Sequence, residues 1–271
     1  MDLSLGEHPL VQAAILGVVE GATEFVPVSS TGHLIIAADW LGFEGERAKV
    51  FEIFIQLGAI LAVVWLYRAR LTRLLTAAGD PGSQRLLGGL FVAFLPAAAV
   101  GLLAHEAIKR HLFNPATVAA ALVAGGVAIL AIERWRPRAR IAAVDAVPLA
   151  TALGIGLAQV LSLVPGTSRS GATIMGAYCL GLSRVAATEF SFFLAIPTMI
   201  AACSYDLLKS LGTLSAADVP LFAVGFLVSF ASALIVVRAF VSFVSRRDFV
   251  PFAYYRIGFG LALLAWYRGG P

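Results

Sequence analysis

One apolar stretch of the chain, residues 15–34, carries six side chains that could do chemistry. They supply two carboxylates, three hydroxyls and an imidazole: Glu20, Glu24, Ser29, Ser30, Thr31 and His33. Ionisable groups are costly in hydrocarbon, so they are kept mainly where they face a cavity or take part in a reaction. Glu20 and Glu24 are four residues apart, so a helix would place both on one face, and Pro27 would end that helix. We therefore expect a helix that is interrupted at membrane depth and lines a cavity.

Ser30 and His33 have the spacing of a nucleophile and its base. They are three residues apart, so a helix that begins near Ser30 would carry His33 on the same face one turn later. A hydroxyl beside a base is an activated nucleophile, and imidazole suits proton transfer near neutrality. Two alternatives remain open: His33 is itself the nucleophile, or it is only a polar cap on a re-entrant loop.

A second polar break, residues 165–171, contains one arginine between two apolar stretches. The fork of donors on Arg169 suits phosphate oxygens, and the glycines at both ends of the loop allow close backbone approach. Hydroxyls and backbone N–H groups would complete an anion site. The candidate phosphate-binding residues are Gly166, Thr167, Ser168, Arg169 and Ser170, with Ser29 and Thr31 from the first break. The alternative is an arginine that only pairs with Glu20 or Glu24.

The acid pair has three open interpretations. Glu20 and Glu24 could be a general acid and base, or oxygen ligands of a divalent cation. Mg²⁺ is usually held by one or two carboxylates together with substrate phosphates. The third interpretation is charge compensation for Arg169.

The composition indicates that these residues belong to a membrane protein. Of 271 residues 59% are hydrophobic and only 13% charged, and the mean hydropathy is +0.88, so we expect a polytopic membrane protein. The net charge of +4 comes from arginines in short loops, which indicates membrane orientation rather than nucleic-acid binding. The first ten residues lack the features of a removable signal peptide. The two cysteines have no metal or redox spacing.

The chain divides into two similar halves within a single integral membrane domain, residues 1–140 and 141–271. Each half is predicted to be a re-entrant helical hairpin followed by three transmembrane helices. The first hairpin covers residues 15–41, with spans at 51–67, 86–104 and 115–132; the second covers 148–182, with spans at 188–207, 220–237 and 249–267. Three crossings are an odd number, so the second half would be inverted relative to the first. Broken helices in corresponding positions of two such halves are typical of a site at the bilayer midplane.

Loop charges predict the orientation. The loops on one side of this arrangement hold twelve Lys and Arg residues, and those on the other side hold six. The positive side is cytoplasmic, so both termini are expected outside. The first hairpin would then dip in from outside and the second from the cytoplasm, and the site would open outward.

Two motifs carry a family resemblance. The sequences EGATEFVPVSSTGH (residues 20–33) and PGTSRSG (165–171), with FEIFIQLGAILAV (51–63) between them, resemble the bacterial undecaprenyl-diphosphate phosphatase family (UppP, also called BacA). The resemblance covers essentially the whole chain. It implies hydrolysis of undecaprenyl diphosphate to undecaprenyl phosphate and inorganic phosphate in the bacterial inner membrane. It also implies recycling of the lipid carrier for peptidoglycan synthesis, bacitracin resistance, and dependence on Mg²⁺ or Ca²⁺.

The mechanism we expect is metal-assisted phosphoryl transfer. Arg169 and its loop hold the diphosphate, a cation at Glu24 and Glu20 neutralises charge, and Ser30 attacks the distal phosphorus. His33 or Glu24 handles the proton. The rival from another class is a polyprenyl-phosphate transporter or flippase, because inverted repeats with broken helices are common in transporters. The sequence leaves open whether the chain forms a homo-oligomer and which chain length it prefers.

Overall fold

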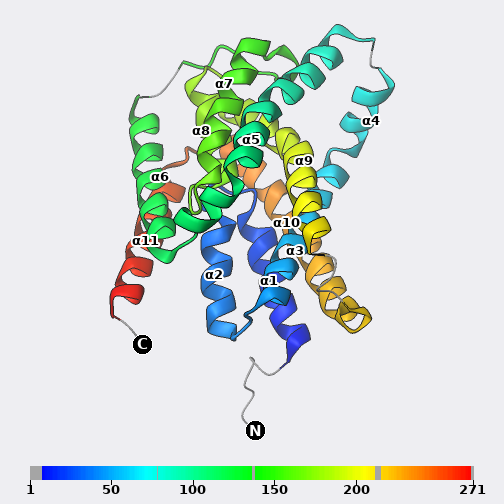
Figure 1. The fold of residues 1–271 in the computed structure, drawn as a ribbon. Coiled ribbons are helices and arrows are strands. Elements are labelled where there is room, and N and C mark those ends of the chain that lie inside the picture. Colours follow the sequence, from blue (N-terminus) through cyan, green and yellow to red (C-terminus); the bar gives the residue numbers. More distant parts are fainter. Residues whose placement is uncertain (1–7, 78, 136–137, 211–214, 270–271) are drawn as a thin grey trace.

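The described part of the protein, in a computed structural model, is a bundle of helices (Figure 1). It comprises residues 8–77, 79–135, 138–210 and 215–269. The helices are α1 (Pro9–Thr23), α2 (Ser30–Leu41), α3 (Glu46–Leu66), α4 (Arg68–Thr76), α5 (Pro81–Leu112), α6 (Pro115–Trp135), α7 (Leu149–Val160), α8 (Arg169–Cys179), α9 (Arg184–Lys209), α10 (Val219–Val244) and α11 (Val250–Gly269). Residues 1–7, on which the signal-peptide prediction depends, and Arg136, which entered the charge count, lie outside this part.

Five of the helices are long and apolar enough to cross a membrane. They are Glu46–Leu66, Pro81–Ala104, Pro115–Trp135, Arg184–Lys209 and Ala216–Val244. These helices agree with the predicted all-α polytopic membrane protein. The sixth expected span, residues 249–267, forms α11 and is long enough, but Arg256 and several tyrosines make it less apolar than the other five.

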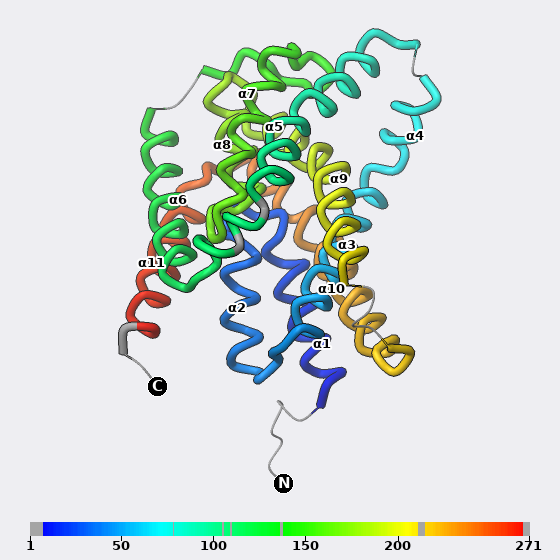
Figure 2. The backbone as a smooth tube through the Cα atoms, in the orientation of Figure 1, coloured from blue at the N-terminus to red at the C-terminus, as the bar shows by residue number. Residues whose placement is uncertain are grey.

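Two helical hairpins lie between the long helices, and each contains a break. The first hairpin is α1 and α2, broken at residues 24–29, and the second is α7 and α8, broken at 161–168. In the ribbon, α1 and α2 reach the centre from the lower edge and α7 and α8 reach it from the upper edge (Figure 1). The smooth tube in Figure 2 shows the blue and green breaks approaching each other near the middle of the molecule.

Each break ends on a serine in an unusual conformation. Ser29 is the N-cap of α2 and Ser168 is the N-cap of α8, and both have a φ of 72°. They are the only non-glycine residues with positive φ in the described ranges. Such conformations cost free energy for residues with a Cβ and cluster at binding and catalytic sites.

Glycines allow the first helix of each hairpin to pack closely on a long helix. A Cβ on Gly17 would lie 2.6 Å from the carbonyl oxygen of Gly225 in α10. A Cβ on Gly156 would lie 2.4 Å from the carbonyl oxygen of Ala93 in α5. Small residues are needed at such crossings because backbone contact, rather than apolar burial, drives association in lipid. The hairpins are therefore held by helices from the other half of the sequence.

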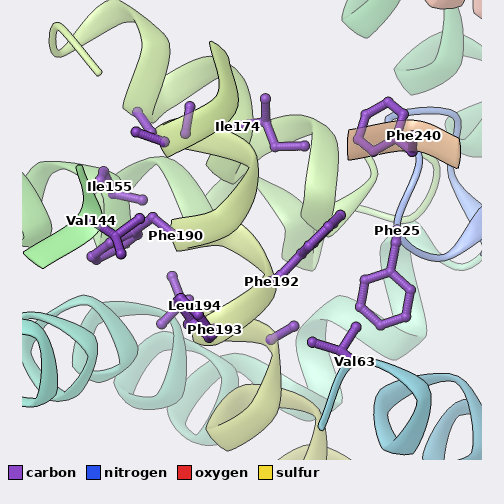
Figure 3. Close-up of a cluster of buried hydrophobic side chains, with 14 of the residues drawn as sticks. Phe25, Val63, Val144, Ile155, Ile174, Phe190, Phe192, Phe193, Leu194 and Phe240 are labelled. Carbon is purple, nitrogen blue, oxygen red and sulfur yellow. The ribbon is translucent and has the colours of Figure 1, made fainter. Parts of the chain in front are cut away.

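A cluster of buried phenylalanines fixes the first break from the side of α9. Phe25, directly after Glu24, is fully buried and meets Phe192 edge to face, with ring centroids 5.4 Å apart. Figure 3 shows these two rings beside Phe240, with Phe190 and Phe193 further along α9. Edge-to-face aromatic pairs add to the stabilisation from burial. The backbone on which Glu24 sits is therefore anchored in the core.

Candidate active site

The two breaks border one cavity of about 430 Å³, which we call the central cavity. Its polar wall comes from both halves of the sequence, and α5 and α9 supply much of the apolar wall. The polar residues at the breaks that line it are Glu24, Ser29, Ser30, Thr31, Ser162, Ser168 and Arg169. With Gly166, seven predicted site residues are therefore brought together, although Arg169 and Glu24 lie 145 positions apart in sequence.

Glu24 joins the hydroxyl of the first break to the guanidinium of the second. Its Oε1 accepts a hydrogen bond of 2.9 Å from Nη2 of Arg169, and its Oε2 accepts a short one from the Ser30 hydroxyl. The side chains of Glu24 and Arg169 are each 11% exposed, so water competes weakly with this pair. A hydroxyl bonded to a carboxylate is positioned to lose its proton and attack.

Arg169 is held so that its planar group faces the cavity. It is the first residue of α8, whose N-cap Ser168 accepts a 3.0 Å hydrogen bond from the N–H of Gly171. Its Nη1 donates to the carbonyl of Ser191 at 3.2 Å, and its Nε is buried with no protein partner. The ring of Phe25 lies 5.4 Å from the guanidinium carbon. The N–H groups at the start of α8 suit an anion.

The other hydroxyls of the second break have mixed surroundings. Ser168 lines the cavity and its Oγ lies 3.0 Å from that of Ser170. Ser170 is fully buried and donates to the carbonyl of Val26 at 2.9 Å, which ties one break to the other. Gly166 lines the cavity, whereas Thr167 does not border it. Ser170 therefore stabilises the two breaks, and neither Ser170 nor Thr167 borders the cavity.

His33 is turned away from Ser30. Its Nδ1 lies 2.7 Å from the Ser29 carbonyl, and its Nε2 lies 2.6 Å from the Tyr255 hydroxyl. Its ring stacks on that of Phe259 at 4.3 Å. A carbonyl oxygen only accepts, so a neutral imidazole donates from Nδ1 and accepts from Tyr255. The expected Ser30–His33 pair is not assembled, because α11 holds the imidazole while Glu24 holds the hydroxyl.

Glu20 is close to the site but does not border the cavity. It is fully buried, and neither carboxylate oxygen has a hydrogen-bond partner. Such oxygens suit a hard cation, since Mg²⁺ and Ca²⁺ prefer oxygen ligands and complete their shells with phosphate or water. Both oxygens of Glu24 already accept hydrogen bonds. No group of three or more His, Cys, Asp or Glu residues gathers for a metal in the described ranges. Glu20 is therefore the candidate cation ligand among these residues, and its oxygens lie outside the wall of the central cavity.

Arg256 was not among the predicted site residues, although it contacts both breaks. It lies in α11, is 1% exposed, and donates to the carbonyls of Pro27 and Thr167 at 3.1 and 2.9 Å. The sequence did contain a signal for it, since an arginine within an apolar span is expensive unless it has a role.

Comparisons with known proteins identify the family to which this chain is similar. The family model described as bacitracin resistance protein BacA matches residues 13–262. The undecaprenyl-diphosphatase of Aromatoleum aromaticum is 55% identical over 99% of this chain and 97% of its own. That of Dechloromonas aromatica is 53% identical over 96% of both chains. Undecaprenyl-diphosphatase 2 of Rhodospirillum rubrum is 56% identical over 98% of this chain and 96% of its own.

Proposed function

Because this chain belongs to the bacitracin resistance protein BacA family, we infer that it is an undecaprenyl-diphosphatase of the membrane. It hydrolyses undecaprenyl diphosphate to undecaprenyl phosphate and inorganic phosphate. The monophosphate is the lipid carrier of cell-wall synthesis, so the enzyme recycles this carrier and confers resistance to bacitracin. The observation that carries the mechanism is the contact of Glu24 with both Ser30 and Arg169 in the central cavity.

The first chemical step is attack by Ser30 on the distal phosphorus. Glu24 takes the hydroxyl proton, an Oγ–P bond forms, and the bond from that phosphorus to the bridging oxygen breaks. Undecaprenyl phosphate leaves, and Ser30 carries the phosphoryl group. Arg169 neutralises charge on the phosphoryl oxygens, which is the main task of catalysis in phosphoryl transfer. The hydrogen bond from Ser30 to Glu24 favours this role for Ser30 over a nucleophilic His33.

The second step returns the enzyme to its starting state. The proton that Glu24 took from Ser30 leaves with undecaprenyl phosphate, so Glu24 can accept a proton from the water that attacks the phosphoserine. Glu24 returns this proton to Ser30 Oγ as the Oγ–P bond breaks and inorganic phosphate leaves. Ser29, Thr31 and Ser168 border the same space and are available to orient phosphate oxygens. His33 contributes indirectly, since it bonds the carbonyl of Ser29 in the strained turn before Ser30.

A divalent cation, Mg²⁺ or Ca²⁺, would be held by Glu20, with Glu24 beside it. When bound, it supplies charge neutralisation for the diphosphate. The two unpartnered oxygens of Glu20 support this proposal, because a buried carboxylate without donors is costly unless it meets a cation or a proton.

The architecture we propose is two inverted repeats, residues 1–140 and 141–271, each a re-entrant hairpin plus three membrane-crossing helices. The opposite approach of the two hairpins supports it (Figure 1). So does the matched φ of 72° at Ser29 and Ser168, each the N-cap of the second helix in its hairpin. The tight glycine crossings at Gly17 and Gly156 fall at corresponding positions of the two halves.

We propose that the enzyme lies in the inner membrane with its termini and its cavity facing outward. The C-terminal parts of α5 and α9 line the cavity through Leu102, Ile108, Tyr205 and Asp206. These parts lead to the loops that carry fewer Lys and Arg residues, the side assigned to the exterior. Labelling single cysteines placed at positions 44 and 83, in a variant without the natural thiols, tests this orientation. Position 44 should react with an impermeant reagent from outside and position 83 only from the cytoplasm.

The wall between α5 and α9 suits an isoprenoid chain. It is apolar and carries the small residues Ala97, Ala98, Gly101, Ala201 and Ala202. A polyprenyl tail can therefore leave the cavity toward lipid while the diphosphate stays at the breaks.

Phosphate release is the test of the proposed function. Purified protein in detergent with Mg²⁺ should release inorganic phosphate from a polyprenyl diphosphate, and Glu24→Gln protein should not. Absence of release by well-folded wild-type protein would contradict the phosphatase. The rival transporter would instead move polyprenyl phosphate across liposomes without hydrolysing the diphosphate.

A further inference from the structure

We propose that Arg256 is a positioning residue for phosphoryl transfer, because its guanidinium fixes the two broken loops relative to each other. This inference rests on the proposed phosphatase activity. Arg256 does not border the central cavity, so it acts through the loops rather than on the substrate.

All five N–H donors of Arg256 are used on backbone carbonyls. Nη1 donates to Pro27 at 3.1 Å and to Thr167 at 2.9 Å. Nη2 donates to Gly166 at 3.0 Å and to Ala121 at 3.1 Å, and Nε donates to Leu122 at 3.3 Å. A guanidinium has five such donors, so no capacity is left for another partner. One rigid planar group therefore joins the first break, the second break and helix α6.

Two of the bonded carbonyls lie a few residues before the reactive side chains in sequence. Pro27 precedes Ser30 by three residues, and Thr167 precedes Arg169 by two. The same nitrogen, Nη1, bonds both of these carbonyls. One atom of Arg256 therefore helps to set the distance between the serine and the guanidinium of the site, together with the hydrogen bond from Ser170 to Val26.

The burial of Arg256 shows that this arrangement is specific. The residue is 1% exposed, and the ion pairs between described residues do not include it. A buried charge without a carboxylate is retained only if other dipoles compensate it. Here backbone carbonyls from α6 and from the two breaks compensate the charge of Arg256. The positive charge therefore lies next to the loops that form the proposed phosphate site.

Helix α6 makes room for the guanidinium with a glycine. A Cβ on Gly125 would lie 2.1 Å from Nη2 of Arg256, so any larger residue must displace the group. Gly125 is absent from the cavity wall. A substitution there moves Arg256 without altering a residue that contacts substrate, and so it is an independent probe.

The experiment compares Arg256→Lys and Gly125→Ala with Gly258→Ala in full-length purified enzyme. Gly258 is on α11 too, but a Cβ there meets nothing within 4 Å, which makes it the matched control. Phosphate release from farnesyl diphosphate with Mg²⁺ gives kcat and KM per folded molecule, with folding checked by size exclusion and melting temperature. Lysine keeps the charge, but its ammonium has three donors and cannot replace the five of the planar guanidinium.

We expect Arg256→Lys to lower kcat about a hundredfold and Gly125→Ala about tenfold, because displacement of reacting groups by about 1 Å has effects of this size. KM should change little and Gly258→Ala should behave as wild type. Unchanged kcat and KM in the folded fraction of either variant would overturn the proposal. Failure of both variants to fold would also overturn it, because Arg256 would then serve the fold alone. Failure of the proposed phosphatase function itself would appear differently, as no release by wild type and control.

Discussion

Replacing Glu24 by glutamine removes one charge at the centre of the site and keeps the shape of the side chain. The amide oxygen can still accept from Arg169, but the NH₂ group must then face Ser30 and cannot take its proton. Loss of a positioned general base costs about 10² to 10⁴ in rate, so we expect kcat to fall about a thousandfold. At about 1.36 kcal/mol per factor of ten, this is a loss of about 4 kcal/mol of transition-state stabilisation.

The same substitution should cost less in stability than in catalysis. The hydrogen bond to Arg169 survives as a weaker one, so we expect the free energy of unfolding to fall by about 1 to 3 kcal/mol. The pair is only 11% exposed on each side, so solvent screens this change weakly. The melting temperature in detergent should therefore drop while the protein remains folded.

Steady-state phosphate release at saturating substrate, which gives kcat, is the assay, with Glu46→Gln as the matched control. Glu46 also pairs with a cation, Lys49, but its side chain is 74% exposed and far less is lost at such a surface pair. Glu46→Gln should keep wild-type activity. Turnover by Glu24→Gln close to that of wild type would refute the assignment of Glu24 as the base.

Four further outcomes are expected. Ser30→Ala should abolish formation of a phosphoenzyme in rapid-quench experiments, whereas His33→Gln should still form one; the reverse result would make His33 the nucleophile. Arg169→Lys should lower kcat about a hundredfold, since one oxyanion contact is worth about that much, and unchanged kcat would contradict the phosphate site. A chelator should stop phosphate release and added Mg²⁺ or Ca²⁺ should restore it; activity that persists in chelator would remove the cation. Gly156→Ala should lower stability by about 1 to 3 kcal/mol through overpacking against α5, measured as melting temperature, whereas Gly88→Ala, whose Cβ would lie 3.6 Å from its neighbour, should not.

The secondary structure was largely predictable because its signals are local. Apolar runs of membrane length gave the long helices, and proline with small polar residues gave the two breaks. Helix ends were less accurate. The residues Arg68–Thr76, expected only to close a span, form helix α4. The two halves of the site could be paired because acids and an arginine need each other in an apolar setting.

The partner of Ser30 was harder to predict. The rule that residues three apart share one face applies within a helix, and it does not fix the direction of the first side chain. Ser30 is the first residue of α2, so its side chain can turn back toward the preceding loop and reach Glu24. His33 lies within the same helix and contacts Tyr255 of α11, which is 222 positions away in sequence. No pattern within residues 15–34 could indicate that contact.

The partners of Arg256 could not be identified from sequence for a more general reason. When a guanidinium bonds carboxylates, its partners can be recognised in the sequence, because acids in an apolar chain are few. When it bonds backbone carbonyls, its partners cannot be recognised, because every residue has a carbonyl. The sequence does contain the complement of this group, Gly125, but glycines in apolar helices also serve ordinary close packing between helices. Only the fold brings Gly125, Pro27 and Thr167 to one side chain. Where the sequence offers no acidic partner for an arginine in an apolar span, broken helices are the place to look for its partners. The carbonyls freed at such breaks can compensate the charge of the arginine.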